Sequence, residues 1–340
     1  MKRWHRFKTI RRGYFAFWIL AGAYVLSFFL PLLVNNKALI VRYQGRTYFP
    51  IYRFYPASEF GGKDLGLVEY RELKKRLVSE GSGWVVMPVY PYGPTELVAK
   101  PDSRPSWEHI FGTDDRGRDV FARLAYGLNV SLTFAFLVLA LSYAAGVSIG
   151  GFLGYFGGKL DLLGQRFIEI WSALPVLYIL VVLSSMISPS FWSLVVLVSL
   201  FNWMGITYYM RGEFYREKSK DYVAAAVALG APSRTIVFRH ILPNALTPVI
   251  SFAPFAAVTN ITALVALDFL GFGLPAPAPS WGEMVYEGWM SSYDWWLVFF
   301  PLAVMFVTLM LIVFVGESLR SAFDPRTNPA SGQDRSFPRP

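Results

Sequence analysis

Long runs without a charged residue constrain this chain more than any other feature. The longest, Ile170–Met210, contains no Asp, Glu, Lys or Arg over 41 residues. Because a helix needs about 20 apolar residues to cross a bilayer, this run is long enough for two spans. Ser188-Pro189-Ser190 near its middle predicts the turn between them, since proline breaks helices. Pro175, within the first of these two spans, predicts a kink.

Four further apolar runs bring the predicted number of spans to six. They are Tyr14–Val34, Asn129–Phe156, Ile241–Leu267 and Trp295–Gly316. The first run is longer than a signal-peptide core of about 7 to 15 residues, which favours an uncleaved span. Hydrophobic residues make up 54% of the chain and charged residues 16%, whereas soluble domains carry about a quarter charged residues. We therefore predict an all-α membrane protein with six transmembrane helices.

The distribution of Lys and Arg predicts the orientation of these spans. Basic residues gather in cytoplasmic loops. They precede the first span and follow the fourth, at Lys2, Arg3, Arg6, Lys8, Arg11, Arg12, Arg211, Arg216, Lys218, Lys220, Arg234 and Arg239. The loop Gly271–Asp294 has neither Lys nor Arg and is predicted outside. Both termini are therefore predicted to be cytoplasmic, and the net charge of +9 is attributed to this bias rather than to nucleic-acid binding.

The predicted spans divide the chain into four parts. Residues 1–34 form a basic tail with the first span, residues 35–127 a periplasmic insert, residues 128–320 a five-helix core, and residues 321–340 a cytoplasmic tail. The insert is basic yet predicted outside, and long loops are exempt from the charge rule.

The insert carries signals of a small α+β subdomain between the first two spans. Ala38–Tyr43 and Thr47–Phe49 are predicted strands around a turn at Gln44-Gly45-Arg46. Glu69–Glu80 is a predicted helix ended by Gly81, and Trp84–Tyr90 a predicted third strand.

Several kinds of site have no pattern in this sequence. There is no cysteine, and His5, His109 and His240 lack metal-ligand spacing. Gly157-Gly158-Lys159 lacks the spacing of a phosphate-binding P-loop. No ionisable residue is predicted deep in a span, and Asp268 is assigned to the outer end of the fifth span. We therefore predict no enzyme activity, no metal, no nucleotide site on this chain and an external source of energy.

The segment Asp221–Asn244 forms a polar, basic insertion among the apolar runs. Asp221–Leu229 is predicted to be a helix because alanine favours helices, with Tyr222, Ala225, Ala226 and Leu229 on one face. Gly230 predicts the helix end. The small side chains of that face would let another protein approach closely.

A second short helix is predicted to follow Gly230. It begins at Pro232, buries Ile236, Val237 and His240, and is ended by Pro243, after which Asn244 caps the fifth span. The residues alone leave two interpretations open, a docking element at the cytoplasmic face and an amphipathic loop lying on lipid.

Two further groups lie in predicted external regions. Gly112, Thr113, Asp114 and Asp115, with Gly117, form a polar turn before the second span. Helix N-capping is favoured for this turn over ligand contact. For Trp281, Trp289, Trp295 and Trp296 we favour an aromatic belt at the membrane surface over substrate contact.

The pattern Ala225-Ala226, Gly230 and Leu242-Pro243 resembles the EAA loop of ABC importer permeases. In that family the loop forms coupling helices that sit in a groove of the ATPase. Ala224 stands where the family has Glu, so the usual acidic contact is in question, and Asp221 is a candidate replacement.

Other motifs resemble the oligopeptide, dipeptide and nickel branch of these permeases, over about residues 105–327. They are HIFGTDDRGRD at 109–119, GYFGG at 154–158, DFLGFG at 268–273, PSWGEM at 279–284 and FDPR at 323–326. The insert, with ALIVRYQGRTYFP from Ala38 and SEFGG from Ser58, resembles the microcin C-type peptide permease subunit.

The resemblance implies a type I ABC importer permease fold and one half of a heterodimeric pore for oligopeptides or peptide-like compounds in the bacterial inner membrane. The implied partners are a homologous permease subunit, ATPase subunits that bind ATP and Mg, a periplasmic binding protein, peptide and lipid, with no cofactor on this chain. Implied ATPase contacts are Asp221, Tyr222, Ala225, Ala226, Leu229, Gly230, His240, Leu242 and Pro243, within loop 211–244. Candidates on the periplasmic and translocation side are Gly112, Thr113, Asp114, Asp115, Asp268 and Trp281.

Alternatives within the family are import of dipeptides, nickel or other small solutes. Alternatives of other classes are an ion-coupled secondary carrier and a non-transporting scaffold or receptor.

Overall fold

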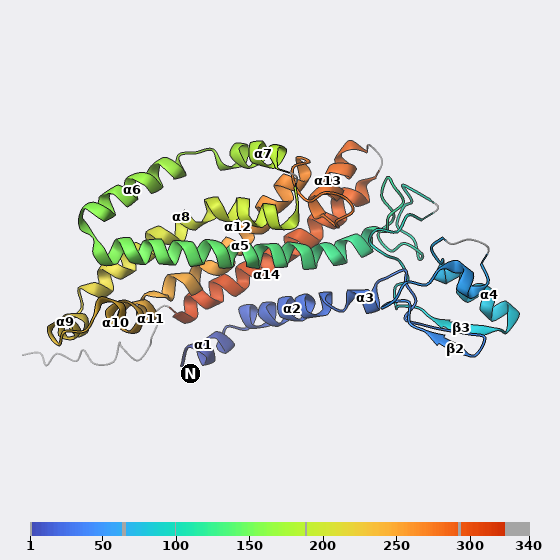
Figure 1. Ribbon diagram of the computed structural model, residues 1–340, viewed down its shortest axis with the longest axis horizontal. Coiled ribbons are helices and arrows are strands. Elements are labelled where there is room, and N and C mark those ends of the chain that lie inside the picture. Colours follow the sequence, from blue (N-terminus) through green and yellow to red (C-terminus); the bar gives the residue numbers. More distant parts are fainter. Residues whose placement is uncertain (1, 63–65, 99, 188, 292–293, 324–340) are drawn as a thin grey trace, which may run out of the picture. The chain divides into compact units, whose positions relative to one another are not determined.

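The computed structural model describes residues 2–62, 66–98, 100–187, 189–291 and 294–323 (Figure 1). The FDPR motif at 323–326 and the predicted cytoplasmic tail 321–340 therefore lie mostly outside the described residues. The chain divides into two units. One comprises residues 1–20, 134–263 and 307–340, and the other residues 21–133 and 264–306.

Most of the apolar runs form the helices that the sequence predicts. Among the described residues, four helices are long and apolar enough to cross a membrane, namely α5 (Val120–Phe156), α8 (Phe191–Lys218), α12 (Thr247–Phe269) and α14 (Trp295–Phe323). A fifth span would be the bent pair α6 (Gly158–Ser172) and α7 (Val176–Met186). The first predicted span is divided between α2 (Arg11–Ser27) and α3 (Leu30–Leu33). At 17 residues, α2 lies at the lower end of spanning length, so the sixth span stays a prediction.

The breaks within the long apolar run have local causes. Pro175 immediately precedes α7, and the axes of α6 and α7 differ by 74° there, which confirms the predicted kink. Ser190 caps α8, since its Oγ accepts from Ser193 N at 3.1 Å and its own N–H donates to Ser193 Oγ at 2.8 Å. Ser188 lies outside the described residues.

Three glycines at intervals of four residues let α5 and α8 approach closely. A Cβ at Gly146 would lie 2.5 Å from Trp203 O, one at Gly150 2.5 Å from Thr207 O, and one at Gly154 2.7 Å from Arg211 O. In a bilayer, helix association depends on such close packing rather than on the hydrophobic effect. Side chains at these positions would separate the two helices.

The insert contains an antiparallel sheet of order β2-β1-β3, formed by β1 (Ile40–Tyr43), β2 (Arg46–Tyr48) and β3 (Gly83–Val86). Gln44 and Gly45 have φ of 47° and 79°, as a tight hairpin turn requires. Helix α4 (Tyr70–Glu80) packs on the sheet around a buried apolar core. The third strand is shorter than predicted and ends before Pro88, which has no N–H for strand pairing.

Shorter helices complete the described chain. They are α1 (Lys2–Thr9), η1 (Ala57–Phe60), α9 (Asp221–Ala228), α10 (Ser233–Thr235), η2 (Ile236–Ile241), α11 (Leu242–Ala245) and α13 (Trp281–Met290). Helices α9 to α11 belong to the first unit and α13 to the second, and these two regions hold most of the predicted functional residues.

The glycine contact predicts a specific loss of stability. We expect Gly150→Leu to destabilise the purified protein by about 1 to 3 kcal/mol, because overpacking forces the two backbones apart. Thermal unfolding in detergent measures the effect. Gly22→Leu in α2 is the matched control, since a Cβ there has no atom within 4 Å. Equal melting temperatures for the two variants would contradict the proposed role of the glycines.

Candidate functional site

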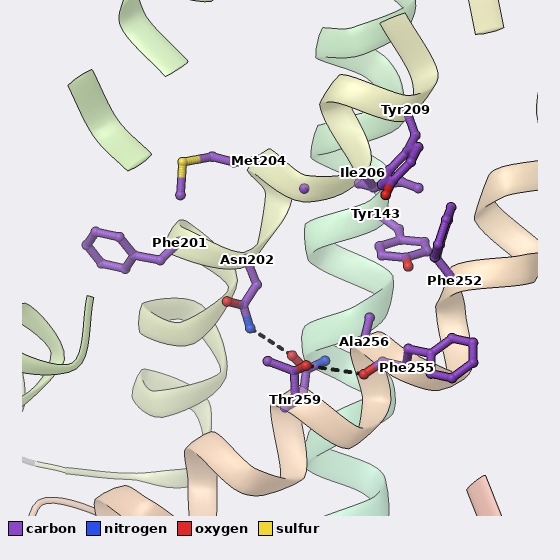
Figure 2. A pocket seen from close by; sticks show the side chains of 12 residues that line it. Tyr143, Phe201, Asn202, Met204, Ile206, Tyr209, Phe252, Phe255, Ala256 and Thr259 are labelled. Atoms are coloured by element: carbon purple, nitrogen blue, oxygen red, sulfur yellow. Dashed lines mark hydrogen bonds between the residues drawn. The ribbon is translucent and has the colours of Figure 1, made fainter. Parts of the chain in front are cut away.

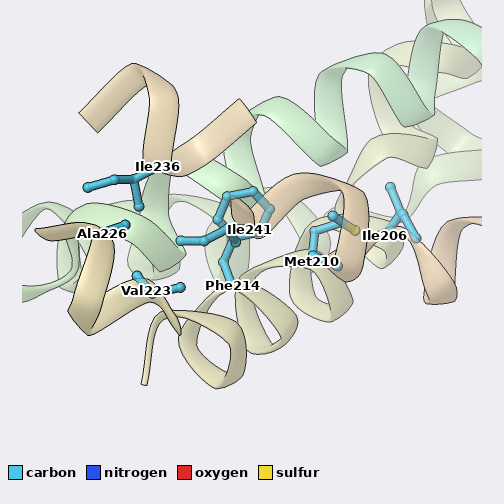
Figure 3. Packing of buried hydrophobic residues seen from close by; sticks show 8 residues of the cluster. Ile206, Met210, Phe214, Val223, Ala226, Ile236 and Ile241 are labelled. Carbon is cyan, nitrogen blue, oxygen red and sulfur yellow. The ribbon is translucent and has the colours of Figure 1, made fainter. Parts of the chain in front are cut away.

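The loop that follows α8 folds around an apolar core of its own. Val223 and Ala226 of α9 point inward against Phe214 of α8 and against Ile236 and Ile241 of η2 (Figure 3). All five side chains are buried. The loop is therefore a structured extension of α8 and not a flexible link.

The chain reverses direction at Gly230, as the sequence predicts. Gly230 has a φ of +75°, where residues with a Cβ are strained. Its N–H donates to Val227 O at 2.9 Å, and Ala231 N–H donates to Ala226 O at 3.0 Å. These bonds satisfy carbonyl groups at the end of α9.

The face predicted for α9 is partly wrong. Ala226 lies in the loop core, whereas Tyr222, Ala225 and Leu229 are exposed. The core takes Val223 and Ala226 because they lie three residues apart, on the side that faces α8 and η2. The outward side is apolar as well, with Leu229 87% exposed.

The second half of the loop departs from a regular helix. Residues Ile236–Ile241 form a π-helical segment, and Pro243 lies in the first turn of α11. Pro243 therefore begins a short helix, although the sequence predicts that it ends one. Asn244 lies inside α11 and donates to His240 O at 2.9 Å, so its predicted role as the cap of the fifth span is wrong. Phe238 is 62% exposed, whereas His240 and Leu242 are half-buried.

A buried carboxylate that sequence reasoning missed ties this loop to α8. Glu217, which is 1% exposed, accepts from Lys220 Nζ and from Tyr222 Oη, both at 2.6 Å. The Tyr222 hydroxyl also lies 3.3 Å from His240 O. Tyr222 therefore joins both halves of the loop to α8, while Asp221 is exposed at the start of α9.

Asp161, in the first turn of α6, binds the end of α8 that leads into the loop. Its two oxygens accept from Arg211 Nε at 2.5 Å and Nη2 at 2.6 Å, and Tyr215 Oη donates at 2.6 Å. This bidentate pair is geometrically specific. The motif GYFGG with Asp161 thus serves to hold the end of α8 that carries the loop.

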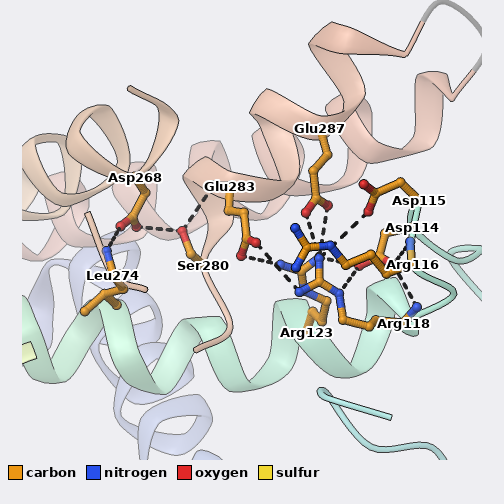
Figure 4. Close-up of polar contacts among 10 residues, drawn as sticks. All are labelled: Asp114, Asp115, Arg116, Arg118, Arg123, Asp268, Leu274, Ser280, Glu283 and Glu287. Carbon is orange, nitrogen blue, oxygen red and sulfur yellow. Dashed lines mark hydrogen bonds and ion pairs between the residues drawn. The ribbon is translucent and has the colours of Figure 1, made fainter. Parts of the chain in front are cut away.

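The second candidate region is a largely buried cluster of five charged side chains, called here the ion cluster (Figure 4). It comprises Asp114, Arg118, Arg123, Glu283 and Glu287. Arg118 Nε lies 2.6 Å from Asp114 Oδ2, and its Nη2 lies 2.7 Å from Glu287 Oε1. Arg123 Nη2 lies 2.6 Å from Glu283 Oε2, and Nη1 lies 3.0 Å from Glu287 Oε2 and also contacts Asp114.

The ion cluster contains one carboxylate more than it has guanidinium groups. Burial raises the pKa of Glu287 to about 7, although Arg123 and Arg118 oppose this shift. A proton on Glu287 would balance the charges of the cluster. Oxygens of Asp114, Asp115 and Glu287 also lie close enough to share a metal ion, but Arg118 and Arg123 already occupy Asp114 and Glu287, so the cluster is an ion-pair network.

The residue that caps α5 is Asp119 and not a member of the predicted turn. Its Oδ1 accepts from Ala122 N at 2.8 Å, and its Oδ2 lies 2.6 Å from Tyr90 Oη and 2.8 Å from His109 Nδ1. No described helix begins directly after Gly112–Asp115, so the helix predicted to be capped there is not found, although Asp114 Oδ1 accepts from the backbone N–H groups of Arg116 at 3.0 Å and Arg118 at 2.7 Å. Asp114 belongs to the ion cluster, and Asp115 is exposed.

The other predicted turn residues hold the segment that precedes α5. Thr113 Oγ1 donates to Lys100 O at 2.9 Å and accepts from Ser103 N at 2.8 Å. Gly112 has a φ of +80°, and a Cβ there would lie 2.5 Å from Ser103 O. This turn is a packed structural element.

Trp281 and Trp296 are buried, so the predicted aromatic-belt role is wrong for both. Each is 1% exposed. Trp281 Nε1 donates to Leu124 O and Trp296 Nε1 to Thr113 O, both at 3.1 Å. Trp289 and Trp295 are exposed, as residues of a belt would be.

Asp268 lies at the end of α12, as predicted, but its side chain is buried. Its oxygens accept from Ser280 Oγ at 2.6 Å and from Leu274 N at 2.7 Å (Figure 4). A Cβ at Gly273 or Gly282 would collide with Asp268. The carboxylate therefore closes the loop between α12 and α13.

Comparison with known proteins places this geometry in a family. The model of the binding-protein-dependent transport system inner membrane component family matches residues 146–329, which include the loop after α8. The inner membrane ABC transporter permease protein YejE of Escherichia coli is 42% identical over 95% of this chain and 96% of its own length. The peptidoglycan transport system permease protein YejE of Agrobacterium fabrum is 37% identical over 96% of this chain and 92% of its own.

More distant similarity agrees with the family. The dipeptide transport system permease protein DppC of Bacillus subtilis is 34% identical over 65% of this chain and 70% of its own length. An inward-facing structure of the MetNI methionine ABC transporter matches with a TM-score of 0.50 and 18% identity, over 59% of this chain and 96% of that chain, which supports the type I importer fold alone. The chain therefore belongs to the binding-protein-dependent transport system inner membrane component family, the membrane permeases of ABC transporters.

Proposed function

We propose that this chain is one of two permease subunits of an ATP-driven importer that moves oligopeptides or peptide-like compounds of the microcin C type from periplasm to cytoplasm. The two subunits would form a heterodimeric pore. The observation that carries the proposal is the loop after α8, which has its own core and presents apolar side chains outward. Exposed apolar side chains of this kind mark protein interaction sites.

Peptide cargo is supported by the relatives and not by a site on this chain. The two YejE proteins are named as permeases, one of them for peptidoglycan transport, and DppC is named for dipeptides. The YejE proteins align with 95% and 96% of this chain, so the alignments must include most of the insert. This supports the microcin C-type subfamily over the dipeptide and nickel alternatives. Uptake assays with a peptide panel in the reconstituted transporter test the choice.

In this proposal, the ATPase subunits bind ATP and Mg, and their conformational change displaces the loop after α8. Phe214 and Met210 of α8 share one apolar core with Val223 and Ile236 of the loop. A displacement of α9 would therefore move α8 instead of bending a linker. ATP would shift the equilibrium between inward and outward states only because the ATPase contacts the loop differently in each state.

On the predicted periplasmic side, the ion cluster would give the binding protein a rigid surface. Arg118 and Arg123 join the start of α5 to Glu283 and Glu287 of α13.

Membership of the ABC permease family argues against the alternative function, an ion-coupled secondary carrier. The orientation, with both termini cytoplasmic, rests on the positive-inside pattern.

The docking role predicts that Leu229→Glu separates the ATPase from the permease. We expect at least a tenfold loss of ATPase recovery in co-purification, because a carboxylate would have to be buried in an apolar interface. Expression and membrane insertion should not change, since Leu229 is 87% exposed. Gly230→Trp is a less clean test because any side chain strains the backbone at this φ.

Leu67→Glu is the matched control for this variant. Leu67 is 85% exposed and lies in the insert, which the proposal places on the other side of the membrane. It should leave ATPase recovery unchanged. Full ATPase recovery with Leu229→Glu would contradict docking at this end of α9.

The ion cluster predicts a pH-dependent stability. The folded-state pKa of Glu287 is raised from 4.5 to about 7. Its contribution to the free energy of unfolding is therefore fully present below about pH 4.5 and is lost as pH rises through about 7. We expect the melting temperature of the wild type to fall across this window and Glu287→Gln to remove that part of the fall. Glu59→Gln, at an exposed glutamate, should behave as the wild type. Parallel pH profiles for wild type and Glu287→Gln would contradict the assignment.

A further inference from the structure

A cavity of about 340 Å³ lies among α5, α8 and α12 (Figure 2). Its walls include the aromatic side chains of Tyr143 from α5, Tyr209 from α8 and Phe252 from α12 (Figure 2). The rings of Tyr209 and Phe252 stack, with centroids 4.3 Å apart. The volume lies at the small end of ligand pockets, about 300 to 1,000 Å³, and suits one part of a larger molecule.

A hydrogen-bond chain fixes how the amide of Asn202 is presented in this cavity. Asn260, which is 2% exposed, donates from Nδ2 to Ala135 O at 3.1 Å. A carbonyl oxygen only accepts, so this bond assigns the two ends of the Asn260 amide. Asn260 Oδ1 must then accept, and it does so from Asn202 Nδ2 at 2.7 Å.

The chain leaves polar atoms of the cavity wall available to a ligand. No described residue donates to Asn202 Oδ1, and its second Nδ2 hydrogen is also without a described acceptor. Within the described chain, the hydroxyls of Tyr143 and Tyr209 have no hydrogen-bond partner either. Polar side chains in spans are costly against lipid and face protein or water-filled cavities.

We propose that this cavity is a transient binding site for cargo, which takes one bulky apolar side chain and one peptide group. This inference rests on the proposed function. An exposed primary amide offers one acceptor and one donor, which matches the N–H and C=O of a peptide group. The aromatic walls match an apolar side chain. A lipid tail would leave the amide and both hydroxyls unsatisfied.

Two glycines of α8 allow a matched test by filling the cavity. Gly205 lines the cavity, whereas Gly212 lies two turns further along α8 and does not. A Cβ at either position has no atom within 4 Å, so the side chain of either variant, Gly205→Phe or Gly212→Phe, starts in open space. The assay is uptake of triphenylalanine and trialanine by the complete transporter, reconstituted with its partner subunits in liposomes.

We expect Gly205→Phe to lower triphenylalanine uptake about tenfold and trialanine uptake by much less, and Gly212→Phe to preserve the wild-type ratio of the two uptakes. Asn202→Leu removes the amide without filling the cavity and should raise KM for both peptides about tenfold, with assembly intact. Its result decides the question if Gly205→Phe fails to fold.

Three outcomes would overturn the inference. One is unchanged uptake of both peptides by Gly205→Phe or by Asn202→Leu. Another is loss of the partner permease from the Gly205→Phe complex, which would make the cavity an interface between subunits. The third is failure of the wild type to import either peptide, which would refute the proposed function first and the cargo site with it. Because that failure occurs before any substitution, the two failures are distinguishable.

Discussion

The backbone contact between α5 and α8 is the constraint on which the first unit depends. Gly146, Gly150 and Gly154 hold the two helices at a separation that no side chain would permit. Helix α8 carries the cavity near its middle and the folded loop at its end. In a bilayer no hydrophobic force presses helices together, so this close packing positions both features.

Most buried polar side chains of the described residues are hydrogen-bonded, and these bonds determine local geometry. Asp161 holds the end of α8 through Arg211, and Asp268 closes the loop before α13. Removing one partner would leave the other polar group without its hydrogen bond, which is costly where that group is buried. Against this background Asn202 is informative, since its Oδ1 has no donor among the described residues.

The features predicted correctly from the sequence have causes that lie within a few residues. The long helices follow from runs of apolar residues, the kink from the missing N–H of Pro175, and the reversal of the loop from the positive φ of Gly230. Each of these causes is local. The stripe of glycines in α5 was not singled out from the sequence. Its meaning depends on which helix lies opposite, and the spacing does not reveal this.

The features that were missed depend on segments far apart in the chain. Arg123 meets Glu283 across 160 residues, and Trp281 reaches the Leu124 carbonyl across 157. Periodicity identifies a face of α9 but not its direction, so Ala226 was placed outside the loop core. The residue types of the turn Gly112–Asp115 suggested a helix cap there, while the cap of α5 is Asp119, and Asp114 is held by two arginines and by backbone N–H groups of its own turn.

The acidic contact that resembling permeases place at Ala224 has one candidate replacement in the described loop. Glu213 pairs with Arg216, and Glu217 is buried against Lys220 and Tyr222. Asp221 alone among the acids of loop 211–244 has no ion pair with a described residue. It lies three residues before Ala224, both are exposed, and residues at this spacing share a helix face. If the ATPase needs a carboxylate on this face, Asp221 can supply it one turn earlier in α9.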